Sequence, residues 1–225
     1  MSFKALNDQQ RRQALVPFLR TAEDLQGVLL SVAIPKTALA AFAGPSFQAK
    51  VEPTLPLQGR WSHSLFDRMF LTVQLTVFII ACVHKPHQNV IWITDVDDFT
   101  ATPQRVSDVA GIASRFCSAY IAHPVGSLAF GTTDLDPGDR FEEDLAAIPD
   151  LIAGASAELL ACVDTMCAGV PPTIAVPVPP LSAKSNTILE WFCKPRFPLQ
   201  RVGFRLQYVD GKGFRVGLWN IKEAW

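Results

Sequence analysis

The sequence Val90-Ile91-Trp92-Ile93-Thr94-Asp95-Val96-Asp97-Asp98 is a short apolar run that ends abruptly in acids. The β-branched and aromatic residues up to Thr94 predict a buried central strand of a parallel sheet, because such strands are apolar almost continuously. Capping of a following helix needs one acid at most, and three follow here. The stretch therefore predicts a strand that delivers carboxylates at its carboxyl end.

Strand and helix patterns alternate around this stretch, which predicts an α/β fold with a largely parallel sheet flanked by helices. Strands are expected at 28–34, 90–94 and 126–131. Helices are expected at 8–25, 61–83, 102–116 and 150–165, with a short one at 37–42 and a helical turn at 141–147. Pro149 is expected in the first turn of the 150–165 helix, where its missing N–H has no intrahelical partner. A short helix at 187–192 and a β-hairpin over 202–221, with Asp210-Gly211-Lys212-Gly213 as its turn, complete the pattern.

The charge of the chain is unevenly distributed. The 225 residues are 49% hydrophobic with a net charge of −1, and the mean hydropathy is +0.20, which excludes a disordered chain. Residues 1–166 hold 12 Lys and Arg against 18 Asp and Glu, whereas residues 167–225 hold 8 against 3. An acidic body with a basic tail fits a metal site beside a phosphate-binding surface, and it equally fits two solvated faces of opposite sign.

Three segments are expected along the chain: a core at 1–166, a proline-rich linker at 167–182, and an appendage of helix and hairpin at 183–225. The five cysteines form no Cys-x-x-Cys pair, which indicates reduced core residues in a cytoplasmic protein. The amino-terminal residues have no secretory signal pattern. The run from Met69 to Val83 is shorter than a membrane span, so we expect a core helix and no membrane.

Three carboxylates fall at related places in this pattern: Asp67 early in the 61–83 helix, Asp95 after the strand, and Asp150 at the expected start of the 150–165 helix. Ligand sites in open α/β sheets form beyond the carboxyl ends of the strands. Carboxylates gathered there repel one another unless a divalent cation neutralises them. The pattern predicts a Mg²⁺ or Mn²⁺ site with Asp67, Asp95 and Asp150 as catalytic ligands and Asp98 as a further ligand. Solvated acids and helix caps are the alternatives, and the helix dipole is a strong one for Asp150.

Other polar groups give weaker signals. The loop residues His84, His87 and His123 have no zinc-site spacing, and no nucleophile elbow or phosphate-binding glycine loop is present. Glu142, Glu143 and Asp144 fit a solvated face, with contact to a metal ion as the less favoured alternative. In the basic segment 194–215 we expect phosphate contacts. Its aromatic neighbours fit either base stacking or, more simply, a small core: Trp191, Phe192, Phe197, Phe204, Phe214 and Trp219.

Several motifs resemble a broad family of uncharacterised bacterial proteins with an RNase H-like fold. They are Arg12-Gln13-Ala14-Leu15-Val16-Pro17-Phe18-Leu19, Trp92-Ile93-Thr94-Asp95, and Glu143-Asp144-Leu145 followed by Asp150-Leu151-Ile152-Ala153-Gly154-Ala155. The similarity covers roughly residues 3–165. It implies an RNase H-like core in which Asp67, Asp95 and Asp150 match acidic positions of the family.

The sequence departs from that family at one point. Members usually begin with a strand that ends in Asp-Glu-Ser-Gly and supplies the first metal-binding acid, and this sequence contains no such stretch. The resemblance therefore implies a shortened or degenerate member whose core lacks that strand and whose site binds metal poorly. A sheet edge left open in this way predicts homodimerisation.

Two functions are consistent with these observations. The first is a metal-dependent nuclease that hydrolyses phosphodiesters, inactive in this form if the missing acid is indispensable. The second is a non-catalytic domain that keeps a degenerate RNase H-like fold and binds nucleic acid or protein.

Overall fold

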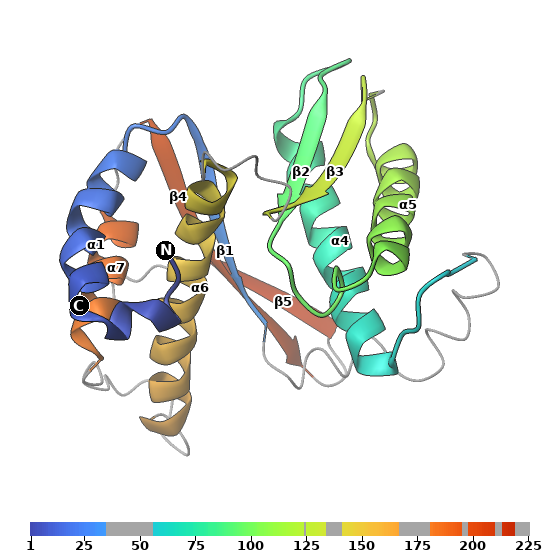
Figure 1. Ribbon diagram of the computed structural model, residues 1–225. Helices are drawn as coiled ribbons and strands as arrows, with labels where there is room; N and C mark the ends of the chain where they lie inside the picture. Colours follow the sequence, from blue (N-terminus) through green and yellow to red (C-terminus); the bar gives the residue numbers. More distant parts are fainter. Residues whose placement is uncertain are drawn as a thin grey trace. The chain divides into compact units, whose positions relative to one another are not determined.

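The computed structural model of the chain describes residues 1–34, 56–123, 125–133, 141–166, 181–194, 198–209 and 213–218. The chain divides into two compact units. Unit 1 consists of Met1–Pro35 and Glu143–Trp225, and unit 2 consists of Lys36–Glu142. The predicted α/β class is confirmed, because helices alternate with short strands that pair mainly in parallel (Figure 1).

Unit 1 contains a three-stranded mixed sheet in the order β1-β4-β5. Strand β1 (Gly27–Ala33) pairs in parallel with β4 (Leu199–Val209), from Gly27 opposite Leu199 to Ala33 opposite Arg205. Strand β5 (Gly213–Leu218) then runs antiparallel to β4, as the hairpin pattern predicted; the turn residues 210–212 lie outside the described part. The sheet therefore joins segments from the two ends of the chain.

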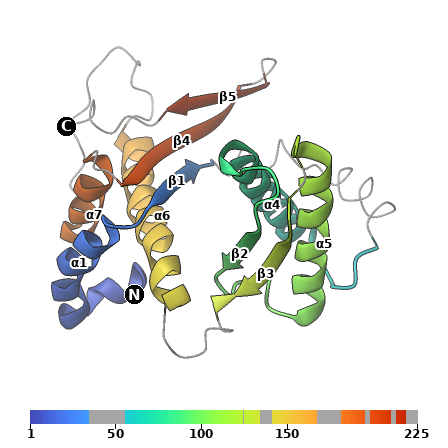
Figure 2. The same cartoon turned by 90° about the horizontal axis from the view of Figure 1, so that it is seen from above.

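Four helical segments complete unit 1: η1 (Lys4–Asn7), α1 (Gln9–Ala22), α6 (Phe141–Met166) and α7 (Ala183–Cys193). Helix α1 begins where predicted, because the Asp8 carboxylate accepts a hydrogen bond from the Arg11 amide at 3.0 Å. Figures 1 and 2 both show α6 alongside β1. The core lies between these helices and the inner face of β1 and β4, with Leu6, Leu15, Leu151 and Leu189 almost fully buried.

Helix α6 differs from the prediction, because it runs unbroken through Pro149 rather than starting at Asp150. Proline inside a helix removes the hydrogen bond to the carbonyl four residues earlier, at a cost of about 3 kcal/mol. Ile148, Leu151 and Ile152 are all buried around it, and burial of each such side chain contributes roughly 1.5–3 kcal/mol. Tertiary packing therefore outweighs the local break.

Unit 2 is built from α4 (His63–Val83), β2 (Val90–Thr94), α5 (Pro103–Tyr120) and β3 (Leu128–Thr132). Strands β2 and β3 pair in parallel, and α5 connects them. Trp92 and Phe130 pack toward α4 and α5, with ring centroids 5.2 Å apart. Ile91 on the opposite face is 73% exposed, so β2 is covered on one face and is not the fully buried strand that its composition predicted.

The division into units also differs from the predicted segments. We expected residues 183–225 to form an appendage beside a 1–166 core, whereas α7 and β4 share the core of unit 1 with α1 and β1. The predicted helix at 37–42 and residues 167–180 of the linker lie outside the described residues. Helix α4 and the 141–163 part of α6 are long and apolar enough to cross a membrane, a property that core helices of soluble proteins share.

Candidate metal site at the carboxyl end of β2

Asp95 follows β2 directly and is held at the carboxyl ends of the two parallel strands. Because Thr94 lies opposite Thr132 in the ladder, both strands end at the same edge. There the Thr133 hydroxyl donates to Asp95 Oδ1 at 3.1 Å, and the Val96 amide donates to the same oxygen at 2.9 Å. Asp95 is exposed, and within the described residues no hydrogen bond reaches its Oδ2. The carboxylate is therefore oriented through one oxygen and presents the other to solvent.

Residues 95–100 form a tight turn that starts at Asp95, and we name it the acidic turn. The Thr100 side chain is buried and accepts a hydrogen bond from the Asp97 amide at 3.0 Å, while its hydroxyl lies 3.2 Å from the Asp95 carbonyl oxygen. Asp97 Oδ1 accepts from the Phe99 amide at 2.9 Å. Burial raises the pKa of Asp97, against the opposing effects of the Phe99 and Thr100 amides and of Arg68. Asp97 therefore stabilises the acidic turn through hydrogen bonds within it.

Helix α4 carries two neighbouring charged residues, Asp67 and Arg68, and Arg68 contacts this turn. Arg68 Nη2 lies 3.2 Å from Asp98 Oδ2, with the two side chains 51% and 78% exposed. Asp67 is half-buried, and its Oδ1 is buried without a hydrogen-bond partner among the described residues. Burial raises the pKa of Asp67, and the charge of His63 partly opposes that rise. A cation bound at such an oxygen would offset the free-energy cost of burying it without a hydrogen-bond donor.

Asp150 does not have the setting that the sequence predicted. It lies in the interior of α6 rather than at a helix start, so the helix-dipole explanation does not apply to it. Its Oδ2 accepts a hydrogen bond from the Phe3 amide at 2.7 Å, which ties the amino-terminal segment to α6. Asp67, Asp95 and Asp98 belong to unit 2, whereas Asp150 belongs to unit 1.

A cluster around Asp108 of α5 was missed by the sequence analysis. Asp108 is 6% exposed and accepts three hydrogen bonds: from the Gln58 amide at 2.8 Å, the Gly59 amide at 2.9 Å and Trp61 Nε1 at 2.8 Å. It thereby fixes the loop that leads into α4. A lone acid on an otherwise amphipathic helix was its only signal in the sequence, and such an acid usually faces solvent.

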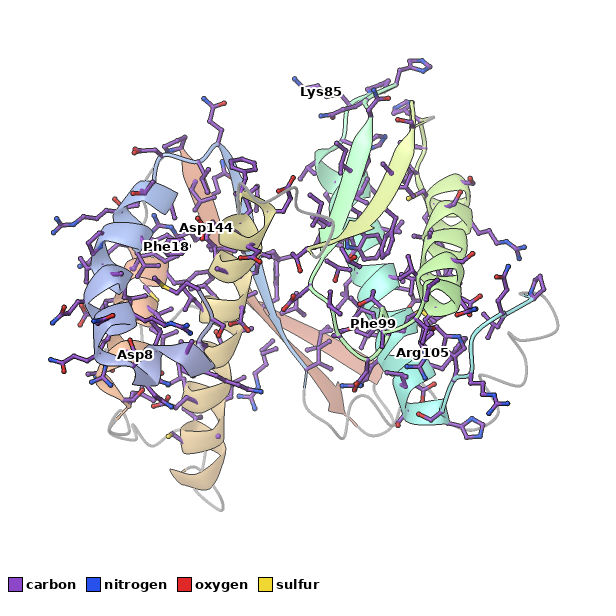
Figure 3. The ribbon with its side chains drawn as sticks, viewed as in Figure 1. Asp8, Phe18, Lys85, Phe99, Arg105 and Asp144 are labelled. Carbon is purple, nitrogen blue, oxygen red and sulfur yellow. The ribbon has the colours of Figure 1, made fainter. Side chains whose placement is uncertain are left out.

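Arg105, one turn before Asp108, links the same loop to the acidic turn. Its Nε and Nη2 donate to the Arg60 carbonyl oxygen at 3.1 and 2.8 Å, and its Nη1 donates to the Asp98 carbonyl oxygen at 2.5 Å. The guanidinium carbon lies 5.4 Å from the centre of the Trp61 ring. Figure 3 shows Arg105 and Phe99 at one end of unit 2 and Lys85 at the other.

The remaining candidates have mainly structural surroundings. Both ring nitrogens of His84 are buried without a partner among the described residues, and His87 adopts a φ of 61°. Among the described cysteines, Cys82, Cys117 and Cys162 are free thiols. Glu143 and Asp144 are exposed, as a solvated face should be. Trp191 and Phe192 are buried in the core of unit 1.

Arg201, in the basic segment expected to contact phosphates, is directed into the protein. Its side chain is 2% exposed and lies 4.0 Å from the centre of the Trp191 ring. Its Nη1 donates to the Trp191 carbonyl oxygen and, at 2.9 Å, to that of Lys194. This guanidinium therefore binds the carboxyl end of α7 instead of a ligand.

Within the described ranges, no three His, Cys, Asp or Glu side chains lie close enough together to hold a metal ion. The side chains that fit a divalent cation best are Asp95, with its free Oδ2, and Asp67, with its unpartnered Oδ1. A scan against family models and searches of curated proteins and of solved structures found no match to this chain.

Proposed function

We propose that this chain is an RNase H-like, metal-dependent phosphodiesterase that acts on nucleic acid, with Asp95 as the principal ligand of a Mg²⁺ or Mn²⁺ ion. The observation that supports it best is the setting of Asp95. Thr133 and Val96 fix one of its oxygens at the carboxyl edge of a parallel strand pair, and the other oxygen is open. Hydrogen bonds to one oxygen of a carboxylate orient its other oxygen for a cation.

The other acids rank below Asp95 as ligands of the ion. Asp67 is the second ligand, because its buried oxygen has no other donor within the described residues. Asp98 pairs with Arg68, the sequence neighbour of Asp67, and is a further ligand in this proposal. Asp150 belongs to unit 1, and its ligand role is only what the family resemblance implies. A bound divalent cation would supply an activated water and stabilise the leaving oxygen. The chain's own residues, Thr133 and Val96, would orient the Asp95 carboxylate.

Calorimetric titration with Mn²⁺ tests the metal site, and cleavage of labelled nucleic acid in Mg²⁺ tests the activity. Because the sequence lacks the Asp-Glu-Ser-Gly acid, we expect weak cation binding that Asp95→Asn abolishes. Asp150→Asn tests the role that the resemblance assigns to that residue. Asp144→Asn, the same change at an exposed acid, is the matched control. Cation binding and cleavage that survive Asp95→Asn would contradict the proposal.

The second candidate is a non-catalytic domain that binds nucleic acid or protein. The observation that favours it is that two of the acids have protein partners: Asp98 pairs with Arg68, and Asp150 accepts from the Phe3 amide. This candidate predicts that a well-folded chain binds no Mn²⁺ and cleaves no nucleic acid.

A further inference from the structure

Two exposed arginines flank the acidic turn, and both are tied to it. The backbone of Arg60 is held there by Arg105, whose guanidinium donates to the carbonyl oxygens of Arg60 and Asp98 together. The side chain of Arg60 is exposed. Arg68 reaches the turn from α4 through its ion pair with Asp98. The backbone of Arg60 and the guanidinium of Arg68 therefore both reach the acidic turn, from separate segments of the chain.

We propose that Arg60 and Arg68 contact the phosphodiester backbone of a nucleic acid that crosses the acidic turn, where Arg105 holds the backbone of Arg60 beside that of Asp98. This inference rests on the proposed function and names its substrate contacts. Guanidinium groups bind phosphate oxygens through paired, charge-assisted hydrogen bonds. Arg201 of the basic segment is buried, whereas half of the Arg68 side chain is open to solvent.

The same geometry couples the cation to the nucleic acid. The carboxylates of the acidic turn repel phosphate until a cation neutralises them. A cation on those carboxylates also weakens the hold of Asp98 on Arg68, and an ion pair with two exposed partners is weak at the outset. Arg68 then exchanges Asp98 for a phosphate. Cation and nucleic acid therefore strengthen each other's binding, and the coupling is reciprocal.

Fluorescence anisotropy of a labelled 20-nucleotide single strand, and of a hairpin duplex, measures this contact in Ca²⁺ and in EDTA over a series of NaCl concentrations. For Arg60→Ala/Arg68→Ala we expect about tenfold weaker binding and a salt slope smaller by about two. The control Arg11→Ala/Arg20→Ala removes two exposed arginines of α1 and the same charge. We also expect wild-type binding to tighten in Ca²⁺, and Asp95→Asn to lose that gain.

The outcomes separate this inference from the proposed function. Equal binding by the two double variants, or no nucleic-acid binding by the wild type, overturns the inference, even if Asp95-dependent cleavage is found. If Arg60→Ala/Arg68→Ala selectively weakens nucleic-acid binding but the wild type cleaves no nucleic acid, the binding surface is supported and the proposed phosphodiesterase activity is refuted. Inorganic phosphate is also added to the labelled oligonucleotide at an equal concentration of phosphate groups. Displacement of the oligonucleotide would show a site for free phosphate and overturn the nucleic-acid contact. If the double variant unfolds, Arg60→Ala and Arg68→Ala singly must each lower the salt slope by about one.

Discussion

Replacement of Asp108 by Asn should destabilise unit 2 strongly although the change is nearly isosteric. In the wild type, Oδ1 accepts from the Gln58 amide, and Oδ2 accepts from the Gly59 amide and Trp61 Nε1, all within 2.8–2.9 Å. An asparagine has one carbonyl oxygen, so at best it retains the two bonds at the Oδ2 position. Its NH₂ group then faces the Gln58 N–H, donor against donor.

The magnitude follows from these losses. A hydrogen bond to a charged group contributes about 1.5–3 kcal/mol, and a donor left unsatisfied in a buried site costs about 1–3 kcal/mol. Asp108 is 6% exposed, so water gives little compensation. We therefore expect Asp108→Asn to lower the free energy of unfolding by about 2–4 kcal/mol, and Asp108→Ala, which leaves three donors unpaired, by more.

Urea unfolding followed by tryptophan fluorescence measures the global effect, and amide hydrogen exchange at Gln58 and Gly59 measures the local one. Asp144→Asn, at an exposed position of α6, should leave both unchanged. A change below about 0.5 kcal/mol for Asp108→Asn, with protection at Gln58 intact, would refute the hydrogen-bonding role assigned to this carboxylate.

Two further predictions concern unit 1. Glu158 accepts from the Ser182 amide at 2.6 Å and from the hydroxyls of Ser182 and Ser185. Burial alone would raise its pKa, but these bonds and the charge of Lys184 lower it overall, so its ionised form stabilises the fold above the usual glutamate pKa of about 4.3. Thermal melts at pH 7 and pH 3 should show Glu158→Gln less stable than wild type at pH 7 and the gap closing by pH 3; a gap that persists at pH 3 would contradict this. Gly154→Ala drives a Cβ into the Phe3 side chain, at a cost of roughly 1–3 kcal/mol against at most about 1 kcal/mol of gained helix propensity. The melting temperature should fall, and Phe3→Ala in the same chain should restore part of it, because that change removes the ring atoms but leaves the Cβ of residue 3, which is 2.7 Å from the added Cβ; a melting temperature equal to wild type in the single variant would rule out the close contact.

Much of the local structure could be predicted because it depends on neighbours in the sequence. Asp8 and Thr102 cap α1 and α5 through amides three residues away, and helices were predicted to start at both residues. The apolar run before Asp95 predicted β2, and the alternation of strands and helices predicted the α/β class. Asp95 was expected at the end of a strand in a parallel pair, and it lies there.

The parts of the site that were not predicted depend on residues far apart in the chain. Asp108 binds amides about 50 positions earlier, and Asp150 accepts from an amide 147 positions earlier. Periodicity and propensity carry no information on such partners, since any exposed acid has the same local pattern. The unbroken helix across Pro149 was missed for the same reason, because long-range burial of Ile148 and Leu151 offsets the local penalty.

By itself, the sequence determined where most helices and strands form and placed acids at the carboxyl end of β2, because caps, turns and apolar periodicity act within a few residues. Only the tertiary structure decided that β1 pairs with β4, about 170 residues away. It also decided that Asp108 binds the loop before α4 and that Arg105 links this loop to the acidic turn. These contacts are selected by shape, burial and the need of buried amides and carboxylates for partners. Those quantities exist only once the chain has folded.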